Sequence, residues 1–292
     1  MIRHAELEEF SWSVRRQELW NRCRRSYFLH YYAARGGHDQ FADSELRRIH
    51  EMRSLLSEKS YLRRLIAMEL RNKFYLPHEE ENPEFPEHVP RLSFAVMSRF
   101  NREFRRMLTG EFQRDHATPM LNTLYDNFTS ASEIKARLDR QLSQMLDALE
   151  SGVWAMLFRS RFLHRRPIDS PLKVAIGHLA CFVAPIIAFQ ERGILSIVAN
   201  GKTDSTALLL RYYAMNQLHI APQNVHTLEL IPEEGILKES GIELNIGHTL
   251  REIRNGAADM LNAIRPSGDV AIDDFPPNLN SCSDCNFRFF CN

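Results

Sequence analysis

The segment from residue 172 to residue 231 decides the fold class. It reads Leu172-Lys173-Val174-Ala175-Ile176, then the apolar run from Leu179 to Phe189, then Ile194-Leu195-Ser196-Ile197-Val198. These alternating, β-branched and aromatic-rich runs are typical of strands, and Gln190-Glu191-Arg192-Gly193 between the last two is a turn. A helix from Ser205 to about Leu218, with Asp204 at its start, precedes a further strand from Val225 to Ile231. The predicted order is strand, strand, strand, helix, strand.

Most of the remaining chain is predicted to be helical, because apolar residues recur there at three- and four-residue steps. The helical segments are Ser11 to Tyr32, Ser44 to Tyr75, Ser93 to Leu108, Met120 to Asp126, Ser130 to Arg159 and Thr249 to Ile264. A linker rich in proline and glutamate separates the second from the third, from Leu76 to Pro90. We therefore expect a helical region over 1–165, an α/β core over 166–265 and a separate C-terminal segment over 266–292.

Composition bounds the class of protein. The chain has 292 residues, 37 Lys and Arg against 37 Asp and Glu, and 44% hydrophobic residues, which is typical of one large or two modest globular domains. The run from Leu179 to Phe189 is too short for a membrane span, and the first nine residues lack an apolar signal region. We expect a cytoplasmic protein without a membrane segment. His178, in the strand region, is expected to be a packed core residue.

The cysteines form the strongest motif. Cys282, Cys285 and Cys291 share one short segment, and a two-residue spacer lets neighbouring thiolates bind the same centre. Cys23 is the preferred fourth ligand, since Cys181 lies in an apolar strand and is better explained as a small buried residue. Ligand type alone does not separate a zinc ion from an iron–sulfur cluster. Plain packing of all four thiols is the remaining alternative.

Both ends of the chain resemble one family. Phe10-Ser11-Trp12-Ser13, the run Leu19-Trp20-Asn21-Arg22-Cys23-Arg24-Arg25-Ser26-Tyr27-Phe28 and the terminal cysteine motif are similar to the iron–sulfur branch of the PD-(D/E)XK nuclease superfamily. That branch includes RecB-like exonuclease domains, AddB-type subunits and CRISPR-associated RecB-like nucleases. The resemblance implies a small mixed sheet flanked by helices, and a structural 4Fe-4S cluster on Cys23, Cys282, Cys285 and Cys291 that joins the two ends.

The nuclease centre of that family is incomplete in this sequence. Asn200 stands where the resemblance implies a carboxylate, although Lys202 follows it, and the preceding strand, Cys181 to Phe189, has no acid. Tyr213 matches the family tyrosine, whereas Leu209 replaces its glutamine, and the upstream segment Leu65 to Leu70 has no histidine. Mg²⁺ normally requires carboxylate or phosphate ligands. We therefore predict a catalytically inactive nuclease homologue.

The resulting functional hypothesis is a DNA-binding or scaffold subunit of a bacterial DNA-processing or defence complex, with a protein partner. Arg22, Arg24, Arg25 and Lys202 are the candidate nucleic-acid contacts. Further arginines occur on the predicted helices, at 47, 48, 63, 64, 71, 99, 102, 105 and 106, although interleaved acids also fit an ordinary solvated face. One alternative is an active metal-dependent DNA nuclease with relocated carboxylates, for which Asp204, Glu191, Glu233 and Glu234 are candidates. A second alternative is a zinc-stabilised protein-interaction module.

Overall fold

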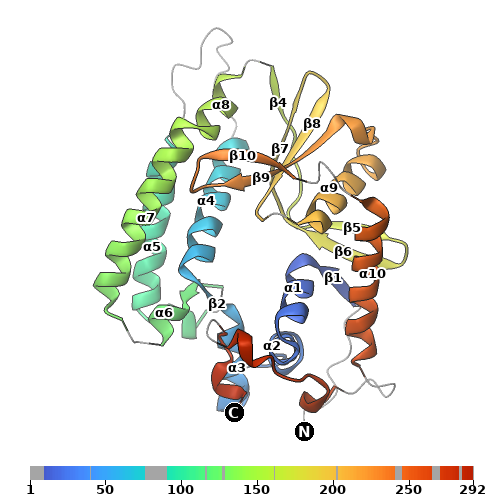
Figure 1. Cartoon of the computed structure of the whole chain (residues 1–292). Coiled ribbons are helices and arrows are strands. Elements are labelled where there is room, and N and C mark those ends of the chain that lie inside the picture. Colours follow the sequence, from blue (N-terminus) through green and yellow to red (C-terminus); the bar gives the residue numbers. More distant parts are fainter. Residues whose placement is uncertain are drawn as a thin grey trace.

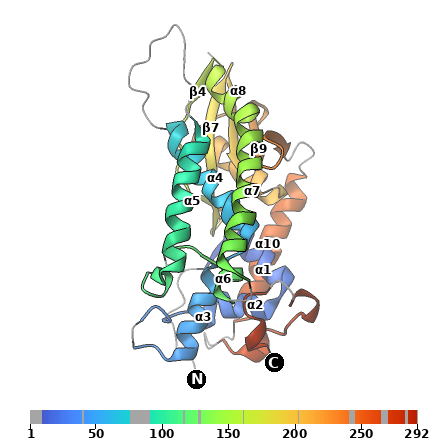
Figure 2. The same cartoon turned by 90° about the vertical axis from the view of Figure 1, so that its left-hand side faces the viewer.

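The structure is a computed structural model. It describes residues 10–39, 41–75, 91–115, 117–126, 129–160, 162–201, 203–240, 245–264, 270–282 and 285–291. Lys202 and the predicted linker from Leu76 to Pro90 therefore lie outside the described residues. Helices α4 (Glu58–Tyr75), α5 (Leu92–Leu108) and α7 (Ala131–Ser151) stand together on one side of the molecule (Figure 1). The main sheet stands on the other side with α9 (Asp204–Asn216) and α10 (Ile246–Asn262). The C-terminal segment lies beside α2 (Arg24–Phe28) and α3 (Ser44–Ser54) at one end (Figures 1 and 2).

The main sheet has five strands in the order β10-β9-β8-β7-β4. Their bounds are β4 Leu163–Arg165, β7 Pro185–Glu191, β8 Ile194–Ala199, β9 Val225–Ile231 and β10 Ile236–Ser240. β7 and β8 form an antiparallel hairpin, and β8 pairs in parallel with β9 after the crossover helix α9 (Asp204–Asn216). The mixed α and β composition predicted from the sequence is confirmed. The element order differs from the prediction by one strand, because four strands rather than three precede α9 over residues 172–231.

A second, three-stranded sheet has the order β1-β6-β5, formed by Ser11–Ser13, Leu179–Val183 and Leu172–Ile176. The apolar run predicted as one strand is thus divided between the two sheets, with β6 ending just before Pro185 begins β7. Proline has no N–H for a strand ladder, which favours a change of sheet at this position. His178 is exposed in the turn between β5 and β6, so its prediction as a core residue was wrong.

The N-terminal segment does not form one helix as predicted. Ser11–Ser13 pair in parallel with β6, and the Ser13 hydroxyl accepts a hydrogen bond from the Arg16 N–H at 3.2 Å, so α1 begins at Val14. α1 (Val14–Arg22) ends at Cys23, whose backbone is extended with φ −163° and ψ 114°. α2 (Arg24–Phe28) follows and continues into the π-helical turn η1 (Leu29–Ala33). Cys23 is therefore a junction between two helices.

The other helices are α3 Ser44–Ser54, α4 Glu58–Tyr75, α5 Leu92–Leu108, α6 Asn122–Tyr125, α7 Ala131–Ser151, α8 Val153–Arg159 and α10 Ile246–Asn262. Two predicted long helices are interrupted. The short parallel pair β2 (Leu55–Leu56) and β3 (Met120–Leu121) separates α3 from α4, and Gly152 separates α7 from α8. Single helical turns lie at Glu111–Gln113, Pro222–Asn224, Ile272–Asp274, Leu279–Ser281 and Arg288–Phe290. Across the described chain, every helix is too short or too polar to cross a bilayer.

The β9–β10 turn fixes the sheet to the helical side. Gly235 has φ +67°, and a Cβ at this position would lie 2.0 Å from the Ala148 carbonyl oxygen on α7. The Gly235 carbonyl accepts a hydrogen bond from the Val153 N–H at 2.9 Å. In the same turn, Glu233 accepts two hydrogen bonds from Arg63 Nη2 on α4, at 2.8 and 3.0 Å. Glycine is required at 235 because only it combines this φ with such a close approach.

A charged group lies between α4 and α5. Arg99 donates to Glu69 on α4 at 2.6 Å and to Glu103 on its own helix at 2.8 Å. Both carboxylates are buried, at 9% and 6% exposure. One guanidinium therefore neutralises two acids that would otherwise be poorly solvated.

Candidate functional site

The first candidate site is where the C-terminal segment contacts α1 and α2. Arg25 Nε donates to the Phe275 carbonyl at 2.8 Å, and the Arg25 N–H donates to the Pro276 carbonyl at 3.3 Å. The Arg22 carbonyl accepts from Asn278 Nδ2 at 2.9 Å and from the Ser281 hydroxyl at 3.2 Å. These contacts join positions about 250 residues apart in the chain.

An apolar anchor lies under these hydrogen bonds. Phe275 is fully buried, with ring centroids 5.2–6.3 Å from those of four N-terminal aromatic residues, Trp20, Tyr27, Phe28 and Tyr32. Such edge and offset arrangements between rings are favourable beyond the burial of apolar area. The aromatic periodicity of the first helix thus corresponds to a docking face for the C-terminal segment.

Three terminal thiols and Cys23 lie near one another at this junction. The Cys23 sulfur accepts hydrogen bonds from the Ser26 N–H at 3.5 Å and the Asn278 N–H at 3.4 Å. The Cys285 N–H donates to the Cys282 carbonyl at 3.2 Å. The pKa of Cys291 is raised, first by burial and then by the charges of the other three thiols. Cys291 therefore lies within electrostatic range of each of the other three thiols.

The thiols are not arranged as ligands of one ion. Over the part of the chain that the structure describes, no three His, Cys, Asp or Glu side chains approach closely enough to hold a metal ion. Cys181 lies apart from the junction, in β6, where it is fully buried and burial raises the pKa of its thiol to about 12. Its position agrees with its prediction as a small packed residue.

The three candidate arginines differ in their surroundings. Arg22 and Arg24 are exposed, and the Arg24 guanidinium lies 4.8 Å from the ring centroid of Trp20. Arg25 is half-buried and uses its Nε in docking the C-terminal segment. Arg22 and Arg24 thus present charge to solvent, whereas Arg25 is committed to a structural contact.

Several of the other arginines proposed to follow a phosphate backbone form ion pairs or hydrogen bonds with other groups of the protein. Arg63 pairs with Glu233, Arg99 with two glutamates, and Arg106 with Glu111 at 2.6 Å. Arg71 donates to two main-chain carbonyls. The carboxylate partners of Arg63, Arg99 and Arg106 reduce the net charge that these three side chains offer to a phosphate backbone, whereas the carbonyl partners of Arg71 are uncharged. Contact of these arginines with nucleic acid stays a prediction.

The vestigial nuclease positions lie around the end of β8. Asn200 is exposed directly after this strand. On the neighbouring strand β7, Ile187 is fully buried and pairs in register with Val198 of β8. Leu209 is buried on α9. Tyr213, one turn further along α9, is 9% exposed. The strand that would supply an acid therefore presents apolar side chains to the core.

Three of the four candidate relocated carboxylates lie elsewhere. Glu191 is at the opposite end of the β7–β8 hairpin from Asn200, about 20 Å away at the usual rise of a strand. Glu233 is paired with Arg63, and Glu234 is exposed in the same β9–β10 turn. Only Asp204 is local to the strand end, in the first turn of α9, where an acid interacts favourably with the helix dipole.

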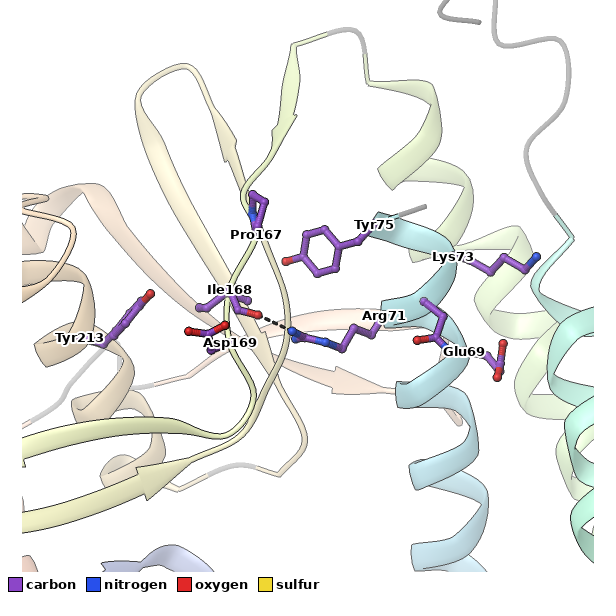
Figure 3. A pocket seen from close by; sticks show the side chains of 9 residues that line it. Glu69, Arg71, Lys73, Tyr75, Pro167, Ile168, Asp169 and Tyr213 are labelled. Carbon is purple, nitrogen blue, oxygen red and sulfur yellow. Dashed lines mark hydrogen bonds between the residues drawn. The ribbon is translucent and has the colours of Figure 1, made fainter. Parts of the chain in front are cut away.

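The second candidate site is a pocket of about 750 Å³ between α4 and α9. It is lined by Glu69, Arg71, Asn72, Lys73, Tyr75, Pro167, Ile168, Asp169 and Tyr213. Figure 3 shows Arg71 and Tyr75 reaching from α4 toward the segment 167–169, with Tyr213 approaching that segment from the other side. Five of the nine lining residues belong to the C-terminal part of α4, and one is the vestigial family tyrosine.

The Tyr75 hydroxyl of the pocket is held by main-chain hydrogen bonds, whereas the Asp169 carboxylate is exposed. The Tyr75 hydroxyl donates to the Arg166 carbonyl at 2.7 Å and accepts from the Ala188 N–H at 2.8 Å. Asp169 is exposed, and its charge, after the larger effect of burial, raises the pKa of Tyr213. Tyr213 therefore stays protonated at neutral pH and keeps an O–H donor near an acid.

Sequence reasoning named Arg71 only among the arginines of a basic helical surface, and it missed Tyr75 and Asp169. The spacing of Arg71 and Tyr75, four residues apart on one helix, was the available signal for a stacked pair, and the guanidinium carbon does lie 5.4 Å from the ring centroid. Asp169 gave no signal because its neighbours come from two distant helices.

No protein-family model matches this sequence, and no curated protein matches it. The residues and geometry of these two sites are therefore the basis for assigning a function.

Proposed function

We propose that this protein is a catalytically inactive homologue of the PD-(D/E)XK nucleases, with a structural iron–sulfur cluster, and that it acts as a DNA-binding or scaffold subunit of a bacterial DNA-processing or defence complex. The observation that carries the proposal is that Cys23, Cys282 and Cys285 each act electrostatically on Cys291, while the Asn278 N–H of the C-terminal segment donates to the Cys23 sulfur. The resemblance of both cysteine segments to the iron–sulfur branch of that superfamily motivates the family assignment.

The topology of the main sheet supports the nuclease-like core. An antiparallel hairpin, β7–β8, is followed by α9 and by β9 parallel to β8. This is the strand, strand, helix, strand order that the resemblance implies for a catalytic core. The agreement concerns the arrangement of elements, and function depends on the site rather than the fold.

The chemistry of the site supports inactivity. Hydrolysis by this family requires a divalent ion that generates the nucleophile and neutralises the developing charge. Here the run from Cys181 to Phe189, which would supply one ligand, has no acid, and the other expected ligand position carries the exposed amide Asn200. An amide carbonyl alone is a poor substitute, because Mg²⁺ releases its waters reluctantly and prefers carboxylates.

The donor set suits a cluster held by four thiolates. Cys23 already accepts two main-chain N–H hydrogen bonds, which stabilise a sulfur that carries negative charge. A four-iron cluster takes one thiolate on each iron, so its ligands stand further apart than four ligands on one zinc ion. When bound, the cluster would hold the two chain ends together, since a thiolate-bound centre contributes directly to folding stability.

DNA cleavage assays test inactivity. The full-length protein, incubated with single- and double-stranded DNA and either Mg²⁺ or Mn²⁺, is expected to give no products above a metal-free control. Cleavage that disappears in Lys202→Ala would refute the proposal and favour the active nuclease with relocated carboxylates.

DNA binding is tested through the exposed arginines. Replacing Arg22 and Arg24 by alanine should weaken binding uniformly across sequences and lower the slope of log K against log salt by about 2, because each phosphate contact contributes about 0.9. Arg251 and Arg254, exposed on α10 and not among the candidate contacts, provide a control pair of equal charge. An equal loss in the control pair would show nonspecific charge effects, and no binding by the wild type would leave the scaffold role alone.

A further inference from the structure

The pocket beside Tyr213 contains an arginine that is held rigidly while its charge remains available. Arg71 Nη1 donates to the Ile186 carbonyl at 3.0 Å, Nη2 donates to the Ile168 carbonyl, and the guanidinium packs over the Tyr75 ring. A guanidinium has five N–H donors, so these two bonds leave others for a ligand. Both acceptors are uncharged carbonyl oxygens, and these bonds therefore leave the positive charge of Arg71 intact.

A carboxylate faces the same space from the opposite wall. Asp169 is exposed on the segment between β4 and β5, and Figure 3 shows it between Tyr213 and the tip of Arg71. A carboxylate only accepts hydrogen bonds, whereas a guanidinium only donates them. The pocket thus offers one group of each kind, together with the Tyr75 ring as an aromatic wall.

This pair of groups matches the two edges of guanine. Arginine donates in parallel to the O6 and N7 acceptors of guanine, which is the commonest specific contact to that base. A carboxylate accepts in parallel from the N1–H and the N2 amino group of the same base. Adenine and cytosine lack an N–H beside their amino group, so neither gives the carboxylate two donors. An aromatic side chain supplies a stacking surface for a base.

We propose that the pocket lined by Arg71, Tyr75 and Asp169 binds a guanine base. Asp169 accepts from N1–H and N2–H, Arg71 donates to O6 and N7, and Tyr75 supports the ring. A volume of about 750 Å³ also leaves room for the sugar and phosphate of a nucleotide. The inference goes beyond the proposed function and depends neither on the cluster nor on the nuclease-like interpretation of the sheet.

Calorimetric titration of the full-length protein tests the proposal. Guanosine monophosphate is expected to bind about 5- to 150-fold more tightly than adenosine or cytidine monophosphate, which is the discrimination typical of one bidentate base contact. Ribose 5-phosphate should not compete. Equal binding of all nucleotides, or competition by ribose 5-phosphate, would overturn the base site and indicate a phosphate site instead. No binding of guanosine monophosphate at millimolar concentration would overturn it as well.

The Asp169→Asn substitution gives a second, sharper test. An amide accepts from N1–H but donates where the N2 amino group also donates, so guanine binding should weaken about 10- to 100-fold. Xanthine carries a carbonyl oxygen in place of that amino group, so xanthosine monophosphate should bind the variant better than guanosine monophosphate does. Because Asp169 is exposed, the melting temperature should not change. Asp147→Asn, on α7 and outside the pocket, is the matched control and should bind as the wild type does.

The source of the base follows from a third titration. A single-stranded oligonucleotide with one guanine is compared with guanosine monophosphate and with the same strand carrying adenine. Tighter binding of the guanine strand than of the free nucleotide supports the site and identifies a nucleic-acid strand as its ligand, whereas tighter binding of the nucleotide supports a free ligand. An unchanged preference in Asp169→Asn, for either ligand, would contradict the proposal.

Discussion

Replacing Phe275 by alanine is expected to release the C-terminal segment from α1 and α2. The ring is fully buried, and an aromatic side chain of this kind removes about 200 Å² from water, which corresponds to about 5 kcal/mol at about 25 cal/mol per Å². Alanine keeps part of that burial, which lowers the expected loss to about 4 kcal/mol, within the range of about 3–5 kcal/mol for such truncations. The four neighbouring aromatic rings restrict collapse into the cavity.

Urea unfolding followed by circular dichroism measures this loss as a change in the free energy of unfolding, and limited proteolysis shows whether the segment is released. Leu279→Ala is the matched control, because that side chain lies in the same segment and is 74% exposed, so its effect should stay within about 0.5 kcal/mol. A loss below about 1 kcal/mol in Phe275→Ala, or equal losses in both variants, would refute the packing argument.

Three further predictions concern the rest of the fold. Gly235→Ala should lower the free energy of unfolding in urea by more than about 2 kcal/mol. The control Gly177→Ala, also at positive φ but in open space, should lower it by only about 1 kcal/mol. Similar losses in the two variants would argue against the close contact of Gly235 with α7. Arg99→Ala should lower the free energy of unfolding by about 3–5 kcal/mol, because it leaves two buried carboxylates unpaired. Replacing the exposed Arg102 on the same helix by alanine should lower it by less than about 0.5 kcal/mol. Equally small effects of both substitutions would contradict the pairing of Arg99 with the two glutamates. Burial and nearby arginines lower the pKa of His30 to about 3, so its NMR signals should not titrate between pH 5 and 8. The free energy of unfolding should fall as the pH drops from the ordinary histidine pKa of 6.5 toward 3, because only the unfolded chain binds the proton in that range. An NMR titration midpoint near pH 6.5 in the native protein would disprove the burial of His30.

The main sheet was predictable because strand signals are local. The β-branched runs at β7 and β8 depend only on neighbouring residues, as does the alternation over Leu172–Ile176 in the second sheet, and the structure has strands at all three places. β1 was not predictable, since its three residues are held by pairing with β6, about 170 residues away. The break at Cys23 was missed for a similar reason, because helix periodicity continues through it while its sulfur and the C-terminal segment favour an extended backbone there.

In the candidate sites too, features that depend on neighbouring residues could be predicted, whereas features that depend on distant residues could not. Cysteine spacing is a sequence property, so the terminal trio could be recognised directly, and the choice of Cys23 over Cys181 followed from the apolar surroundings of Cys181. The role of an arginine depends instead on partners that the fold supplies. Arg63 and Glu233 are 170 residues apart, and Arg71 and Ile186 are 115 apart. The pocket is built from three distant segments, and its one local signal in the sequence was the four-residue spacing of Arg71 and Tyr75.

Iron and acid-labile sulfide analysis of the protein purified without oxygen tests the central claim most directly. We expect about four irons and four sulfides per chain, a brown colour, and loss of both elements in Cys23→Ser, as for a thiolate-bound 4Fe-4S cluster. Cys181→Ser, the control at a buried thiol outside the junction, should keep both elements. Zinc without sulfide, or a Cys23→Ser variant that retains its iron, would contradict the account.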